Sequence, residues 1–350
     1  MKSHIVLLMP SHSNFCTPII ENLNFHGYKV TFIDASPEFK NKIKVSLWHK
    51  IIHVIQNVVF NNPNYKNDLK EKIKDQSIQQ QIEHIPTLDD DDWVLVIRPD
   101  LVTRERLEQL RKKTAKHYIG YQWNGLQRFP QTLSRIQLFD RFFAFDHTDL
   151  IHPEFKAYNL MGTTNFYFDL IEPSPLLVDS PVAYFVGLHF DERIKPLEQC
   201  AALLLEHGLR LDFNIRILKH VEETKKKYHQ SAIQFIDKNI EFAENIEYIN
   251  RATVLVDILN PIHQGLSFRT FEALQFQKKL ITSNPHIQSY DFYHPDNIFI
   301  WEPNNLPNLK DFLARPYSQI DQNIVKKYCF HNWLKNILDI APYQKIVLPD

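Results

Sequence analysis

The chain has 350 residues with 40 basic and 41 acidic side chains, so its formal net charge is only −1. This near-neutral balance excludes the overall basic character that binding along a nucleic-acid backbone requires. Hydrophobic residues make up 44% of the chain and aromatic residues 13%, which is enough for two packed cores, and the length also favours two domains. We therefore expect a globular protein without a nucleic-acid partner.

The N-terminus and the cysteines bear on location. The first apolar run, residues 5–9 (IVLLM), is too short for a signal peptide and is typical of a buried strand. Cys16, Cys200 and Cys329 lie far apart and show no zinc-binding spacing, as expected in a reduced compartment. We expect a cytoplasmic protein with no bound metal.

Strand and helix patterns alternate along the first half of the chain. Apolar runs predict strands at residues 5–9, 29–34, 93–97, 117–123 and 141–145. Helical spacing predicts helices over residues 15–26, 61–84, 104–113 and 133–139, and Thr103 is a suitable N-cap for the third. This alternation predicts a doubly wound α/β domain over residues 1–172.

The same alternation restarts after residues 170–182 (LIEPSPLLVDSPV), whose three prolines predict a linker. Further strands are expected at residues 183–186, 213–218, 254–258 and 280–282, with a helix over residues 196–207. A second α/β domain over residues 173–325 follows from this pattern.

Residues 257–284 (DILNPIHQGLSFRTFEALQFQKKLITSN) carry the strongest signal for a ligand, since a buried strand leads through a loop into a helix starting near Ser267. The free N–H groups of a helix start bind anions, and Gly265 lets the backbone approach a ligand closely. Arg269 opposes the helix dipole unless an anion lies nearby, and Glu272 can accept hydrogen bonds from a sugar hydroxyl. The alternative is an ordinary serine-capped helix with an Arg269–Glu272 pair.

Residues 265–274 (GLSFRTFEAL) and 279–284 (KLITSN) resemble the donor-binding segment of GT-B glycosyltransferases. The likeness is greatest to bacterial lipopolysaccharide and capsule glycosyltransferases, including the spore-maturation-protein-like branch. Five further segments resemble the same enzymes, namely residues 94–100 (VLVIRPD), 118–130, 139–146, 184–187 (YFVG) and 191–193 (DER). The resemblance implies two Rossmann-like domains facing across a cleft, with a last helix near residues 328–338, in the segment 326–350, packing back on the N-terminal domain.

The resemblance also implies an activity, the transfer of a sugar from a nucleotide-sugar to a glycan or lipid-linked glycan acceptor. The C-terminal domain would hold the donor and the N-terminal domain the acceptor, without a metal or other cofactor. The resemblance implies phosphate contacts from Ser267, Arg269 and Thr270, and a ribose or sugar contact from Glu272. It also implies additional cations at Arg193 and Lys219. Gly187 and Gly265 complete the implied donor-binding set.

One position departs from the family pattern. Many retaining GT-B enzymes have a glutamate eight residues before the position of Glu272, and Gln264 stands there instead, so the stereochemical outcome is open. An inverting enzyme needs a base for the acceptor hydroxyl. His12, in the first strand-to-helix loop, and Asp100, after the strand at residues 93–97, are the candidates, with capping and structural roles as the alternative.

Residues 39–60 mix lysines with large apolar side chains, a basic amphipathic pattern suited to an anionic membrane surface. It predicts peripheral contact with the inner face of the cytoplasmic membrane, and a core-packed helix with solvated lysines is the alternative. Two other functions stay open. One is a sugar-nucleotide epimerase of the same architecture, and the other is a non-enzymatic two-domain sugar-binding protein.

Overall fold

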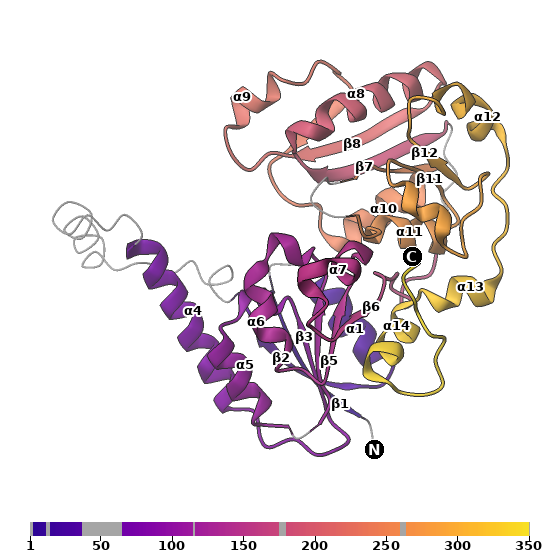
Figure 1. Ribbon diagram of the computed structural model, residues 1–350. Helices are drawn as coiled ribbons and strands as arrows, with labels where there is room; N and C mark the ends of the chain where they lie inside the picture. Colours follow the sequence, from indigo (N-terminus) through magenta and orange to yellow (C-terminus); the bar gives the residue numbers. More distant parts are fainter. Residues whose placement is uncertain are drawn as a thin grey trace. The chain divides into compact units, whose positions relative to one another are not determined.

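The computed structural model describes residues 3–11, 15–36, 65–114, 116–174, 180–259 and 264–349. The chain divides into two compact units, Met1–Ala144 with Pro153–Met161, and Phe145–His152 with Gly162–Asp350. Two six-stranded sheets with intervening helices make up the fold (Figure 1). Among the helices of the described ranges, none has the length and apolar character needed to span a membrane. The segment 39–60, His12 and part of the predicted linker lie outside the described residues.

The first sheet has the strand order β2-β1-β3-β4-β5-β6. Its strands are β1 (His4–Met9), β2 (Lys29–Asp34), β3 (Trp93–Ile97), β4 (Tyr118–Gln122), β5 (Arg141–Ala144) and β6 (Leu160–Gly162). The first five strands pair in parallel, and central residues such as Leu7 and Leu95 are fully buried. Continuous apolar runs form these strands because helices cover both faces of a parallel sheet.

The first unit has helices between its strands. They are α1 (Cys16–Phe25), α4 (Tyr65–Glu83), α5 (Arg104–Arg111) and α6 (Leu133–Ile136), with the short 3-10 turns η1 (Pro99–Leu101), η2 (Leu126–Arg128), η3 (Pro130–Thr132) and η4 (Pro153–Phe155). Thr103 caps α5, as predicted, by accepting a hydrogen bond from the backbone N–H of Arg106.

The second sheet has the order β12-β11-β10-β7-β8-β9, again with parallel pairs. Its strands are β7 (Val182–Leu188), β8 (Arg210–Arg216), β9 (Ile233–Ile236), β10 (Val254–Asp257), β11 (Lys279–Thr282) and β12 (Ile298–Ile300). The predicted strands at residues 183–186, 254–258 and 280–282 are confirmed within a residue or two at each end. The predicted strand at 213–218 starts earlier, at Arg210.

The second unit has helices α7 (His147–Ile151), α8 (Asp191–Glu206), α9 (Val221–Lys225), α10 (Phe242–Arg251), α11 (Phe268–Gln275), α12 (Leu309–Ala314), α13 (Gln322–Lys327) and α14 (Phe330–Leu338), with the 3-10 turns η5 (Pro285–Ser289) and η6 (Leu306–Asn308). The prediction that α8 begins at Pro196 is wrong. The helix begins at Asp191, because Asp191 and Glu192 favour its positive N-terminal end and Pro196 is accommodated inside it.

The C-terminal helix α14 packs aromatic side chains against Phe166, which belongs to the same unit. Trp333 is fully buried, and its ring centre lies 4.4 Å from that of Phe166. Phe330 lies 5.1 Å from the same ring. The predicted domain limits and the return of this helix to the first domain stay predictions.

We expect Trp333→Ala to lower the free energy of unfolding by about 3–5 kcal/mol, because it removes a large buried aromatic side chain and leaves a cavity. The matched control is Val347→Ala, since Val347 also lies near the C-terminus but is 58% exposed. The control should change the free energy of unfolding by less than about 0.5 kcal/mol. Urea unfolding followed by fluorescence and circular dichroism measures both, and equal small effects would contradict the packing described.

Candidate functional site

The carboxyl ends of β7 and β10 lie side by side in the second sheet. The chain begins this sheet at β7, adds β8 and β9 on one side, and then adds β10, β11 and β12 on the other. The strand order therefore reverses between β7 and β10. In open parallel sheets, ligands bind outside the carboxyl ends of the strands at such a reversal.

Arg193, in the first turn of α8, spans this reversal. Its Nε donates to the carbonyl oxygen of Leu259, just after β10, at 3.4 Å, and its Nη1 donates to that of Leu188, the last residue of β7, at 3.5 Å. A Cβ at Gly187 would lie 3.1 Å from the Phe185 ring and 3.4 Å from Nη1, so Gly187 adjoins the guanidinium at an ordinary contact distance. Both hydrogen bonds are long, which leaves donor capacity for an anion. Burial lowers the pKa of Arg193, and the charge of Asp257 partly offsets this effect.

Ser267 is the N-cap residue of α11, as predicted, but its hydroxyl makes no capping hydrogen bond. The Oγ atom instead donates to Oδ2 of Asp257, at the end of β10, over 2.8 Å. Close by, Ser283 Oγ accepts a hydrogen bond of 2.7 Å from the backbone N–H of Leu259. The end of β10 and the start of α11 are thereby held together, and the side chain of Ser267 leaves the first N–H groups of α11 uncapped.

Arg269 and Glu272 form an ion pair on α11. Arg269 Nη1 lies 2.9 Å from Glu272 Oε2, and each side chain is 11% exposed. Asn245 of α10 donates to Glu272 Oε1 over 2.9 Å and accepts a hydrogen bond of 2.9 Å from the Tyr184 hydroxyl. The Arg269 guanidinium carbon lies 4.8 Å from the centre of the Tyr184 ring. Burial lowers the pKa of Arg269, but the neighbouring acidic groups, above all Glu272, outweigh it and raise the pKa overall.

The Arg269–Glu272 pair that the sequence offered as the alternative explanation of this helix is therefore present. Both carboxylate oxygens of Glu272 are already engaged, since Oε1 accepts a hydrogen bond from Asn245 and Oε2 lies in the ion pair with Arg269. A donor phosphate or hydroxyl that contacts either side chain has to compete with these bonds.

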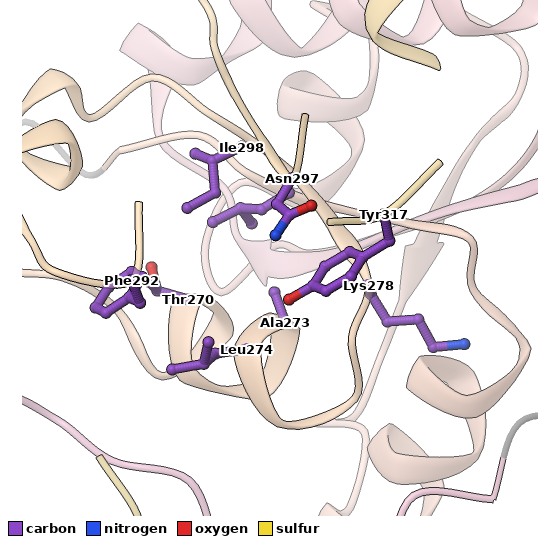
Figure 2. Close-up of a pocket in the computed structure, with 9 residues that line it drawn as sticks. Thr270, Ala273, Leu274, Lys278, Phe292, Asn297, Ile298 and Tyr317 are labelled. Carbon is purple, nitrogen blue, oxygen red and sulfur yellow. The ribbon is translucent and has the colours of Figure 1, made fainter. Parts of the chain in front are cut away.

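The side chain of Thr270 is directed into a small pocket rather than toward solvent (Figure 2). Its Oγ1 is buried and has no hydrogen-bond partner among the residues that the structure describes. Apolar groups dominate the lining, which consists of Thr270, Ala273, Leu274, Lys278, Leu280, Phe292, Asn297, Ile298 and Tyr317. Thr270 and Arg269 therefore have different surroundings, although both were predicted to meet the donor phosphates.

Gly265 allows a close backbone approach, and the neighbour it approaches is Phe145. A Cβ at Gly265 would lie 2.5 Å from the Phe145 ring and 2.7 Å from its carbonyl oxygen. The adjacent Gln264 N–H donates to Oδ2 of Asp146 over 2.7 Å, which fixes the same turn. Lys219 follows β8 at the carboxyl edge of the sheet and is exposed.

The two predicted base residues belong to the first part of the chain, and of these the structure describes Asp100. Nε and Nη2 of Arg98 donate to the two carboxylate oxygens of Asp100, each over 2.6 Å, and the Asp100 side chain is 1% exposed. A general base has to come within hydrogen-bond reach of the acceptor hydroxyl. A base role for Asp100 therefore requires this ion pair to open.

Sequence reasoning did not single out Asn245, Tyr184 or Asp257 as parts of the site. Asp257 ends a predicted strand, so its place at the carboxyl edge could have indicated its importance. Tyr184 lies inside a predicted strand without a polar signal, and Asn245 lies on a helix that was not predicted. Only the fold brings these two residues to Arg269.

No family model and no curated protein matches the chain. Among solved structures, a glycosyltransferase from Rickettsia africae has a TM-score of 0.52 at 13% identity, over 97% of this chain and 97% of that one. The apo form of the lipopolysaccharide outer core galactosyltransferase WaaB has a TM-score of 0.47 at 13% identity, over 95% of this chain and 97% of that one. The S. aureus MnaA–UDP co-structure has a TM-score of 0.47 at 14% identity, over 99% of this chain and 100% of that one.

These similarities concern the fold. The two parallel six-stranded sheets with interleaved helices confirm the predicted α/β, GT-B class, and the glycosyltransferase from Rickettsia africae has a similar arrangement over nearly the whole chain. How the two units face each other stays a prediction.

We expect Arg269→Ala to lower the free energy of unfolding by about 3 kcal/mol, because it leaves the buried carboxylate of Glu272 without its cation. The double variant Arg269→Ala/Glu272→Ala should lose less than the sum of the two single variants, by about 1 kcal/mol or more. A double-mutant cycle by urea unfolding measures this coupling.

The matched control is the exposed pair Arg104–Glu108 on α5, with side chains 48% and 44% exposed. Its coupling should stay below about 0.5 kcal/mol, as is usual for exposed pairs on a helix. Strictly additive effects of Arg269 and Glu272 would contradict the buried network described above.

Proposed function

We propose that this chain is a glycosyltransferase that moves a sugar from a nucleotide-sugar donor to a growing surface polysaccharide, of lipopolysaccharide or capsule type. The observation that carries the proposal is the position of Arg193, which links the ends of β7 and β10 at the reversal of strand order. The sheet order counted from β9 to β12 is that of dinucleotide-binding Rossmann domains, whose ligands bind at this point. The assignment to the spore-maturation-protein-like branch rests on the resemblance of residues 265–274.

The proposed donor site uses cations and backbone N–H groups in place of a metal or cofactor. A nucleoside diphosphate carries at least two negative charges, which Arg193 and Lys219 can balance. The uncapped start of α11 supplies N–H groups from Ser267 onward, and Gly265 lies in the loop just before it. Thr270, the third proposed residue here, already donates its N–H to the carbonyl oxygen of Ser267 over 3.2 Å and would have to exchange this bond for the donor. The other members of the set are Gly187, which adjoins Arg193 near the end of β7, and Arg269 and Glu272. These last two meet the donor by exchanging their mutual ion pair for contacts with phosphate and with ribose or sugar.

The stereochemical outcome is open, and the base candidates apply to an inverting reaction, in which the acceptor hydroxyl oxygen bonds to the anomeric carbon of the donor sugar. The bond from that carbon to the diphosphate oxygen breaks, and the base takes the hydroxyl proton. His12 and Asp100 are the proposed bases. Gln264 carries no charge, so the proposed step does not depend on a carboxylate at that position.

The proposed acceptor is a glycan or a lipid-linked glycan. We place the enzyme in the cytoplasm, with the basic amphipathic segment 39–60 in peripheral contact with the inner membrane surface. Co-sedimentation with anionic vesicles tests this placement, and Lys→Glu changes at positions 40, 42 and 44 should abolish the binding. Vesicle binding that survives these changes would refute it.

A thermal-shift screen with UDP, GDP, CMP and dTDP, followed by calorimetric titration, should identify one nucleotide that binds and stabilises the protein. Arg193→Ala should weaken the affinity for that nucleotide by about 30-fold, because one charge-assisted contact to a partly desolvated phosphate is lost. The affinity of Arg193→Lys for the nucleotide should lie between those of the wild type and Arg193→Ala, since lysine keeps the charge but lacks the planar guanidinium group.

The matched control is Lys195→Ala, an exposed cation in the next turn of α8. It should bind the nucleotide like the wild type. If no nucleotide binds, or if Arg193→Ala and Lys195→Ala bind the nucleotide equally well, the proposed donor site is wrong. Incubation with the nucleotide-sugar alone distinguishes a glycosyltransferase from a sugar-nucleotide epimerase, because an epimerase converts the sugar without an acceptor.

A further inference from the structure

A second group of cations lies in the first unit, around the ring of Phe129. We define this arginine cluster as Arg98, Arg128 and Arg135 with Asp100 and Phe129. The guanidinium carbons of Arg98 and Arg128 lie 4.8 and 5.2 Å from the centre of the Phe129 ring. Arg135 donates from Nη1 to the carbonyl oxygen of Pro99 over 3.0 Å, which places it beside the Arg98–Asp100 pair.

The charges of the arginine cluster are not balanced within it. Asp100 is the one carboxylate, and Arg98 occupies both of its oxygens. Burial lowers the pKa of Arg135 and the charge of Asp100 raises it, but an arginine stays protonated in either case. Two positive charges therefore remain, that of Arg128 beside the Phe129 ring and that of Arg135 beside the Arg98–Asp100 pair. Gathering like charges costs free energy that a bound anion would recover.

The backbone of Arg98 also sets this position apart. Its φ of 65° is left-handed, a conformation that side chains other than glycine adopt at a cost, and such strain gathers at functional positions. The Arg98 N–H donates to the carbonyl oxygen of Tyr121 over 3.0 Å, which holds Arg98 at the ends of β3 and β4. In this sheet the strand order reverses between β1 and β3, so the end of β3 borders the expected ligand position.

Gln122, the last residue of β4, adds an independent observation. Its side chain is fully buried, and neither its oxygen nor its nitrogen has a hydrogen-bond partner within the described part of the chain. Buried amides are nearly always satisfied in folded proteins. Gln122 follows Tyr121, whose carbonyl oxygen holds the backbone of Arg98, and its amide is closed off from solvent, so a polar molecule meets this amide only when the strand end opens.

We propose that the arginine cluster binds an acidic group of the acceptor, so that the acceptor is a glycan carrying a phosphate or a carboxylate. The inference rests on the proposed function, since it assigns the acceptor of that reaction. Guanidinium groups match the geometry of both anions, and a neutral glycan would leave the cluster unbalanced. Arg128, which is exposed, is the cation best placed to meet an incoming anion, whereas Arg98 is held by Asp100.

Three matched sugars test the proposal on the full-length protein. Glucose 1-phosphate offers a phosphate, methyl β-glucuronide a carboxylate, and methyl β-glucoside has neither. Ligand-detected NMR titrations are run with an excess of the nucleotide that the thermal-shift screen identifies among UDP, GDP, CMP and dTDP, so that the phosphate probe is not read at the donor site. We expect at least one acidic sugar to bind and the neutral glucoside to bind at least about fivefold more weakly, and the stronger acidic sugar identifies the anion.

Arg128→Ala should weaken the binding of that acidic sugar by about fivefold, as expected for an exposed cation. The matched control is Arg141→Ala, because Arg141 also lies over an aromatic ring, 5.1 Å from the centre of Phe143, but at the first residue of β5 and so at the opposite edge of the sheet. The control should bind the acidic sugar like the wild type.

Equal binding of the acidic and neutral sugars, or equal effects of the two arginine variants, would overturn the proposal. The affinity for the nucleotide that the thermal-shift screen identifies, measured separately, should not change in Arg128→Ala. If none of the four screened nucleotides binds to the wild type, the proposed donor site fails, while the preference for acidic sugars is still measured independently.

Discussion

Parallel strand pairing fixes where polar chemistry can gather in this molecule. In a parallel sheet all strands end at the same edge, so residues that follow different strands become neighbours there. In the first sheet, Arg98 and Asp100 reach this edge after β3. In the second sheet, Gly187 and Asp257 reach the carboxyl edge of that sheet at the ends of β7 and β10. The apolar side chains of the buried strands make none of the proposed ligand contacts. The register of these strands nevertheless determines which polar residues become neighbours at the edge.

Helix α11 shows how a charged helix can be buried. Five consecutive residues, Thr270–Leu274, are buried, so no side of the helix is fully solvated. Charges in such a place need partners, and Arg269 has them in Glu272 and the Tyr184 ring. The unfavourable position of an arginine in the first turn is thus already compensated within the protein. Donor binding at these residues would therefore be an exchange of partners rather than the filling of an empty site.

The sequence predicted the parts of the fold that depend on local patterns. Continuous apolar runs located β1, β3 and β10, and Thr103 located the start of α5. It could not locate contacts made by tertiary packing. The Ser267 hydroxyl donates a hydrogen bond to Asp257 instead of capping its own helix. Gly265 packs against Phe145, which is more than a hundred positions away in the sequence. Asp100 was recognised as an acid at a strand end, but its ion pair depends on the left-handed turn at Arg98, for which the residue type gives no signal.

Both ends of α11 are tied by hydrogen bonds to one stretch of chain, residues 165–171. Asn165 donates from Nδ2 to the carbonyl oxygen of Leu266 over 2.9 Å, just before the helix. At the other end, Gln275 donates from Nε2 to the carbonyl oxygens of Phe168 and Ile171, at 3.0 and 2.6 Å. Residues 165–171 and α11 consequently behave as one rigid element. A ligand that displaces the helix displaces residues 165–171 with it, so the hinge of such a motion has to lie outside both segments.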